Sequence, residues 1–190
     1  MKFAVFPALC LHLALVSAID HNLQPCMPAP YQEAHNTFIN RHVNAGAPEG
    51  GDKKDWGAFL RNNSFCKRPV QSFFPYRDMQ RINDVCSPAG GKIYRQNLCI
   101  SKGNFSFITL TVNNETCHVE RIIRESKHII LACEEIEKMC QPVHYQKNPE
   151  DVVPKENDPD CSGAPSAIHP GIRAPKTSAL FLIFLWSALL

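Results

Sequence analysis

The sequence lacks several features by which small proteins are often classified. It contains no Cys-x-x-Cys pair, which argues against a zinc site built from its cysteines. It also carries almost no net charge, because 20 Lys and Arg residues oppose 18 Asp and Glu residues. This balance argues against a protein that coats nucleic acid or disrupts membranes by positive charge, so any contact with nucleic acid must be local. No internal repeat is present.

Neither apolar end of the chain reaches the roughly 20 residues of a membrane-spanning helix. The first lies in residues 1–18, where Lys2 precedes an apolar run and a small-residue site, Val16-Ser17-Ala18. This pattern is typical of a secretory signal peptide, the alternative being a buried N-terminal helix. Its removal takes Cys10 away and leaves eight of the nine cysteines, and an even number in a secreted chain predicts disulfides.

Three Asn-x-Ser/Thr sequons agree with a secretory route. The predicted glycosylation sites are Asn62, Asn104 and Asn114. Signal peptide and sequons together predict a protein that is extracellular or displayed at the cell surface.

The last residues, 178–190, form the second apolar run, which follows a polar, proline-rich stretch predicted to be a flexible stalk over 148–177. Small residues at Ser162, Gly163 and Ala164, a spacer and a terminal apolar run match a signal for a glycosylphosphatidylinositol (GPI) anchor. We expect Ser162 to be the lipid attachment site. The alternative is a tail that packs on the core or on a partner.

Between these ends, helical periodicity comes first and alternation with a period of two follows. After an extended arm over 19–30, the expected helices cover 31–44, 52–61 and 77–85, and the expected strands cover 105–112, 118–125, 127–134 and 142–146. Helices followed by an antiparallel sheet predict the α+β class.

Several stretches resemble segments of the pancreatic ribonuclease A family. They are TFINRHV (37–43), CKRPVQSFF (66–74), NLCISKGNF (97–105), KHIILACE (127–134) and QPVHY (141–145). The third resembles the same region of the angiogenin-like members. The resemblance covers residues 31–147. It implies a disulfide-stapled fold of three short helices and a curved antiparallel sheet.

The resemblance places the family's catalytic trio on His42, Lys67 and His144. His42 alone, on the helical face of Phe38, would pass for a core histidine, and Lys67 alone for a surface charge. Cleavage of RNA by its own 2′-hydroxyl needs a base and an acid, and two histidines titrating near neutrality supply both. The resemblance implies His42 as base, His144 as acid and Lys67 as stabiliser of the pentacoordinate phosphate, with a 2′,3′-cyclic phosphate as product and no metal or other cofactor.

The same carry-over assigns substrate binding to Ser72, Tyr145 and Arg41. Ser72 stands where the family has a threonine that bonds the pyrimidine, Tyr145 replaces a phenylalanine, and Arg41 replaces a glutamine that contacts phosphate. Three departures accompany them: Arg68 is an extra residue in the lysine motif, Gln71 replaces an asparagine, and Gln146 replaces the aspartate that orients the acid histidine. These changes predict a weak enzyme.

The family pattern also implies the disulfides Cys66–Cys117 and Cys86–Cys133, and a third bridge, from the second helix to the sheet, is missing. Cys26, Cys99, Cys140 and Cys161 remain, and they allow three pairings. We favour Cys99–Cys140, on neighbouring strands, and Cys26–Cys161, between the two arms.

Two functions follow. The first is a secreted or lipid-anchored endoribonuclease that cleaves single-stranded RNA and prefers pyrimidines. The second is a ribonuclease-like extracellular ligand or receptor in signalling, host defence or reproduction, with weak or incidental catalysis. The expected partners are single-stranded RNA, a cell-surface protein, and a membrane if the tail is exchanged for a lipid.

Overall fold

Helices form where the sequence predicted them. The computed structural model describes residues 23–162, so the predicted signal peptide and apolar tail lie outside the described part. The helices of that part are α1 (Ala34–His42), α2 (Lys53–Asn62) and α3 (Met79–Asp84), and a 3-10 turn, η1 (Tyr76–Asp78), leads into α3. Each α-helix overlaps one of the stretches with helical periodicity.

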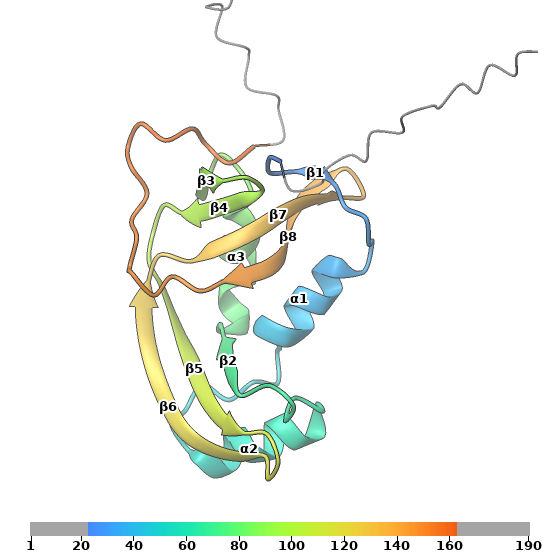
Figure 1. Ribbon diagram of the computed structural model, residues 1–190, viewed down its shortest axis with the longest axis vertical. Coiled ribbons are helices and arrows are strands. Elements are labelled where there is room, and N and C mark those ends of the chain that lie inside the picture. Colours follow the sequence, from blue (N-terminus) through green and yellow to red (C-terminus); the bar gives the residue numbers. More distant parts are fainter. Residues whose placement is uncertain (1–22, 163–190) are drawn as a thin grey trace, which may run out of the picture.

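Two sheets make up most of the remaining fold (Figure 1). Their strands are β1 (Met27–Pro28), β2 (Val70–Phe73), β3 (Gly91–Arg95), β4 (Leu98–Ser101), β5 (Phe105–Asn113), β6 (His118–Lys127), β7 (Ile130–Ile136) and β8 (Met139–Gln146). In one sheet β7 pairs with β1, β4 and β8, and β4 pairs with β3; the other has the order β2, β5, β6. Only β1 and β7 pair in parallel within the described strands. The predicted α+β class is confirmed.

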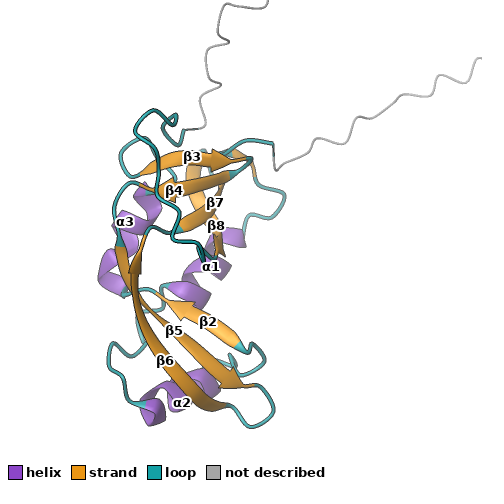
Figure 2. Cartoon of the chain, turned by 60° about the vertical axis from the view of Figure 1, so that its left-hand side comes forward, coloured by secondary structure: helices purple, strands orange, loops and turns teal. Residues whose placement is uncertain are grey.

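The two sheets lie at opposite ends of the molecule (Figure 2). The sheet of β2, β5 and β6 lies beside α2 at one end, and β3, β4, β7 and β8 occupy the other. Helix α1 packs against β8 of one sheet and β2 of the other. The end of α1 therefore meets both sheets where they approach each other.

The described residues form two hydrophobic cores. One core includes Phe38, Ile82 and Leu131, from α1, α3 and β7. The other includes Trp56 and Leu60, one turn apart on α2 and fully buried against β5 and β6. Burial of one large apolar side chain contributes about 1.5–3 kcal/mol. Apolar packing therefore holds α2 on the sheet in place of the missing disulfide.

Four disulfides join the cysteines of the described residues. Cys66 is bonded to Cys117 and Cys86 to Cys133, as the resemblance implied. The others are Cys26–Cys140 and Cys99–Cys161, so the predicted pairs Cys99–Cys140 and Cys26–Cys161 are wrong.

Two short backbone pairings explain the correction. Pro28 of β1 lies opposite Glu135 of β7, whose partner on β8 is Cys140, so β1 carries Cys26 to the β7–β8 hairpin. At the other end, the backbone N–H of Cys161 donates to Gly91 of β3 at 3.0 Å, and β3 pairs with the strand that holds Cys99. Pairings of one or two residues leave no periodic signal in the sequence.

Residues 148–161, expected to begin a flexible stalk, lie against the domain instead. Asn148 is buried, and its side-chain nitrogen donates to two backbone carbonyls, at 3.0 Å and 2.9 Å. Asp160 forms ion pairs with Lys92 at 3.1 Å and with Lys102 at 2.9 Å. Together with the second corrected disulfide, these contacts make the segment part of the folded unit.

None of the helices in residues 23–162 has both the length and the hydrophobicity needed to cross a bilayer. The disulfides are consistent with an extracellular protein.

Candidate active site

A cleft of about 260 Å³ lies between the end of α1, the segment leading into β2, and the end of β8. It is lined by Phe38, Arg41, His42, Arg68, Val70, Gln71, Ser72, Val143, His144, Tyr145 and Lys147. Two of the three predicted catalytic residues and all three predicted substrate-binding residues therefore share one cleft. The exception is Lys67, which is not among the lining residues.

His42 reaches the cleft from the last turn of α1. Its Nδ1 lies 2.8 Å from the carbonyl oxygen of Ser72. Because a carbonyl only accepts, Nδ1 must carry the proton, which leaves Nε2 of the neutral ring without one. Burial is the main cause that lowers the pKa of His42 to about 4; the Ser72 carbonyl opposes it, and Arg68, His144 and Arg41 add to the lowering. The ring is thus a neutral base at most pH values.

His144 enters the cleft from β8, where it lies opposite Ala132 of β7. It is more exposed than His42, and its ring has no hydrogen-bond partner among residues 23–162. Partial burial, then Arg68 and Arg41, lower the pKa of His144. The residue two places on is Gln146 rather than an acid.

Aromatic packing sets the distance between the two elements that carry the histidines. The His42 ring lies between Phe38, with centroids 5.4 Å apart, and Tyr145, at 5.7 Å. Tyr145 in turn packs edge-on against Phe74 at 5.2 Å. A hydrogen bond between Nδ1 of His35 and the carbonyl of Pro142, at 2.9 Å, ties the start of α1 to β8. Helix and strand are therefore held together on both sides of the cleft.

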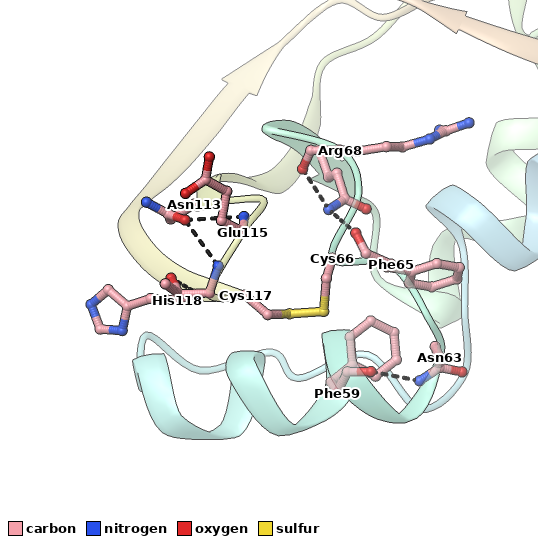
Figure 3. The surroundings of a disulfide bond; sticks show 11 residues. Phe59, Asn63, Phe65, Cys66, Arg68, Asn113, Glu115, Cys117 and His118 are labelled. Atoms are coloured by element: carbon pink, nitrogen blue, oxygen red, sulfur yellow. Dashed lines mark hydrogen bonds between the residues drawn. A yellow bond between two sulfur atoms is a disulfide. The ribbon is translucent and has the colours of Figure 1, made fainter.

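Arg68, and not the predicted Lys67, lines the cleft. Lys67 is exposed and lies outside the cleft, whereas Arg68 lines it and lowers the pKa of both His42 and His144. Figure 3 shows the Arg68 side chain extending away from the Cys66–Cys117 disulfide. Partial burial and Arg41 lower the pKa of Arg68, but a guanidinium stays charged throughout the working range.

Gln71 explains how the segment accommodates its extra residue. Its side chain is 7% exposed, and its Nε2 donates to the carbonyls of Phe65, at 2.8 Å, and Arg68, at 3.1 Å. These bonds fix the conformation of the loop between Cys66 and β2. If positions are counted back from Ser72 instead of forward from Cys66, Arg68 occupies the position that the resemblance assigns to the catalytic lysine.

A second hollow of about 170 Å³ adjoins the cleft and shares Ser72, Tyr145 and Lys147 with it. The remaining residues that line it are Thr109, Glu125, Lys127, Asn148 and Pro149. Burial, followed by the charge of Glu125, raises the pKa of Tyr145 above its usual range, although a hydrogen bond with Ser72 opposes this. The Tyr145 hydroxyl is therefore protonated.

Two larger hollows, of about 330 Å³ and 360 Å³, exist elsewhere among the described residues, but neither is lined by two histidines. One of about 330 Å³ is lined by Phe73, Phe74 and Phe107 and contains Arg77, which is already paired with Glu49 at 2.6 Å. It contains no histidine. The cleft is the candidate active site because two histidines line it, and not because of its volume.

The described residues offer no ready metal centre. The sulfurs of Cys99, Cys133 and Cys161 lie within 4.8 Å of one another, but all three belong to disulfides and so have no thiolate to give. His128 bonds the Ser101 carbonyl at 2.7 Å, remote from the cleft.

Sequence reasoning overlooked Thr109, Glu125 and Lys127. All three lay within predicted strands, but strand alternation alone says only that a residue faces one side of a sheet. The available signal was cross-strand register: Ser72 lies opposite Thr109. Register depends on which strands pair, and this follows from the tertiary fold.

The helices, the two antiparallel-rich sheets and the four disulfides make up a ribonuclease-like α+β fold. Among solved structures, the crystal structure of green turtle egg-white ribonuclease is similar, with a TM-score of 0.50 and 19% identity. The match covers 60% of this chain and 97% of the turtle protein, and at this identity it shows the fold alone. No protein-family model matches the sequence, and no curated protein does.

Proposed function

We propose that the protein is a metal-independent endoribonuclease that cleaves single-stranded RNA after pyrimidines. The observation that carries the proposal is the presence of two histidines in one cleft, with Nδ1 of His42 bound to a carbonyl and Nε2 free to accept a proton. His144 and Arg68 complete the site. The turtle ribonuclease agrees with this at the level of the fold only.

In the proposed reaction, Nε2 of His42 removes the proton of the 2′-hydroxyl, and the 2′-oxygen attacks phosphorus. The bond from phosphorus to the 5′-oxygen breaks, and protonated His144 gives its proton to that oxygen. The products are a 2′,3′-cyclic phosphate and a free 5′-hydroxyl. Arg68 and Arg41 stabilise the negative charge that grows on the phosphate oxygens.

The adjoining hollow supports binding of a pyrimidine. Its 170 Å³ suits a single-ring base, and Ser72 provides a hydroxyl at the boundary between the hollow and the cleft. Tyr145, at the same boundary, offers an aromatic face.

Cleavage of a fluorogenic oligonucleotide with one uridine, in excess chelator, tests this proposal. Replacing His144 with alanine removes the proton donor and should abolish turnover; replacing His42 should do the same. Arg68→Gln and Lys67→Gln form a matched pair, and only the first should reduce turnover. Equal activity of the wild-type protein and His144→Ala, after purification from contaminating nucleases, would refute the catalytic assignment.

We also propose passage through the secretory route. Asn62, Asn104 and Asn114 are all exposed and sterically open to glycosylation. Ser162, next to the last fixed cysteine, stays the proposed lipid site. Release from cells by phosphatidylinositol-specific phospholipase C, and loss of display when 178–190 are deleted, test the anchor; an intact C-terminus in the medium contradicts it.

A second role as an extracellular ligand with incidental catalysis has one observation in its favour. The acid histidine has no orienting partner among residues 23–162, which lowers the expected rate without affecting the surface. A cell-binding signal that survives His144→Ala would support this role.

A further inference from the structure

Helix α1, which carries His42, has little of its own to hold its first turn together. The residue before it, Glu33, makes no side-chain capping bond, and the first turn contains no acidic residue. Helix α2 differs, because the Asp52 carboxylate accepts from the backbone N–H groups of Lys54 and Asp55. A side-chain cap stabilises the start of a helix, and a helix of nine residues is marginal by itself. The start of α1 must therefore be held by contacts outside the helix.

The segment that precedes α1 provides some of these contacts. We call residues 23–33 the leading segment; it contains β1 and runs from there to α1 (Figure 1). Its backbone bonds to β7 twice: the N–H of Cys26 donates to the Cys133 carbonyl, and the N–H of Ala29 donates to the Glu135 carbonyl, both at 2.9 Å. Two such bonds hold the segment only while its ends are kept in place.

A disulfide and a hydrogen bond fasten the leading segment and α1 to β8. Cys26 is bonded to Cys140, four residues before His144. His35, in the first turn of α1, has its Nδ1 2.9 Å from the carbonyl oxygen of Pro142, two residues before His144. Both attachments therefore join the helix that carries one histidine of the cleft to the strand that carries the other.

This disulfide is open to attack in a way that two of the others are not. Cys140 is half-buried. Cys86, Cys133, Cys99 and Cys161, which form two of the other bridges, are each at most 1% exposed. Access of the attacking thiolate to a sulfur is one of the factors that set the rate of disulfide exchange. A reductant should therefore open the bridge at Cys140 while those two bridges stay closed.

We infer that the Cys26–Cys140 disulfide is a redox-sensitive clasp: a dithiol reductant outside the cell opens it, frees the start of α1 from β8 and so lowers the activity of the cleft. A thiolate of the reductant attacks Sγ of Cys140, and Cys26 leaves as a thiolate that takes up a proton. The second thiol of the reductant then displaces Cys140 and closes the reductant's own disulfide. Two electrons and two protons pass to the protein. The inference rests on the proposed ribonuclease function and adds its regulation.

Opening the clasp should loosen α1 without detaching it. Phe38 is 1% exposed in the core, and the backbone N–H of Phe74 donates to the His42 carbonyl at 2.7 Å, so the end of the helix stays in place. The freed start can then tilt about that end, which moves His42 relative to His144. A displacement of about 1 Å can cost about 100-fold in rate. Burial is the main cause of the low pKa of His42, so a looser helix also raises that pKa toward 6.5.

The experiment compares the full secreted protein with the double variant Cys26→Ser with Cys140→Ser. Hydrogen–deuterium exchange of residues 34–38, at the start of α1, should become about tenfold faster or more relative to that of α2. On a uridine-containing oligonucleotide, kcat/KM should fall about tenfold or more. Its acidic limb should move up from about pH 4 toward 6.5, which a change in overall stability would not cause.

The double variant Cys99→Ser with Cys161→Ser is the matched control, because it removes a bridge that fastens the end of the described chain to β4 instead. It should leave the exchange of α1 relative to α2, and the acidic limb, unchanged. The other bridge with a half-buried member is Cys66–Cys117, so the variant isolates the clasp more cleanly than reduction does.

Treatment of the wild-type protein with dithiothreitol, followed by alkylation and mass mapping, gives a second test that does not depend on folding of the variant. Cys26 and Cys140 should be alkylated before Cys99 and Cys161, and α1 should exchange faster in that sample. Unchanged exchange of α1 after the clasp is opened, or opening of Cys99–Cys161 first, overturns the inference. If α1 loosens as expected but the oxidised protein cleaves no RNA, the clasp stands and the proposed ribonuclease function falls instead.

Discussion

For the proposed ribonuclease activity, the low pKa of His42 predicts an optimum in acid. The base must be neutral, and with a pKa of about 4 His42 stays neutral far below the usual value of 6.5. At pH 5 about nine-tenths of such a base is neutral, against about 3% for an unperturbed histidine, a difference of about 30-fold in active base. The acid, His144, must be protonated, and its lowered pKa moves the alkaline limb below 6.5. The optimum therefore lies between these two limits.

The assay is kcat/KM on a uridine-containing oligonucleotide, measured from about pH 3 to about pH 9 at constant ionic strength. The acidic limb should have its midpoint near pH 4. Arg68→Gln removes a cation that lowers the pKa of both histidines, so both limbs should move to higher pH while the rate falls. An acidic limb near 6.5, or an optimum above neutrality, would show that the base is not a buried neutral His42.

Three further predictions concern the same residues and the corrected disulfide. Arg68→Gln should reduce kcat/KM about 10²-fold or more at the optimum pH, whereas Lys67→Gln should change it less than about twofold; the reverse order would restore the lysine assignment. The folded-state pKa of His42 is below its unfolded value, so stability is complete above pH 6.5 and is lost as pH falls toward 4, by up to about 3 kcal/mol. Urea unfolding at both pH values measures this loss, which should shrink in His42→Asn; an equal loss would assign it elsewhere. The double variant Cys99→Ser with Cys161→Ser opens a loop of 62 residues and should cost up to about 4 kcal/mol, seen as a lower Tm, and an unchanged Tm would contradict the pairing.

The parts of the fold that depend on local patterns were predictable. Residues 34–42 and 53–62 repeat their apolar side chains with the helical period, and β5 alternates with the period of a strand. The disulfides Cys66–Cys117 and Cys86–Cys133, which the resemblance implied, are confirmed. The partners of Cys26 and Cys161 were predicted wrongly, because each of these cysteines is placed by a contact of only one or two residues with a distant strand.

The candidate site was predictable where a residue type is tied to a motif, and less so where geometry decides. His42 and His144 fall in the cleft as expected. Lys67 lies outside the cleft. Its segment has one extra residue, and the sequence does not say whether that residue precedes or follows the position that faces the cleft. The hydrogen bonds of Gln71 to Phe65 and Arg68 show how the segment folds. The polar residues that line the adjoining hollow, Ser72, Thr109, Glu125 and Lys127, come from three strands, so no single stretch of sequence contains them.

The fixed segment over residues 148–161 has a consequence for the proposed anchor. Ser162 follows directly on a cysteine that is bonded to β4, so no free chain would separate a lipid there from the folded domain. Both ends of the described chain leave at the pole where β1 and β3 lie, opposite α2 (Figure 1). A lipid at Ser162 would therefore set the orientation as well as the location of the molecule. That pole would rest on the bilayer, α2 would project furthest from it, and substrate would enter from the side.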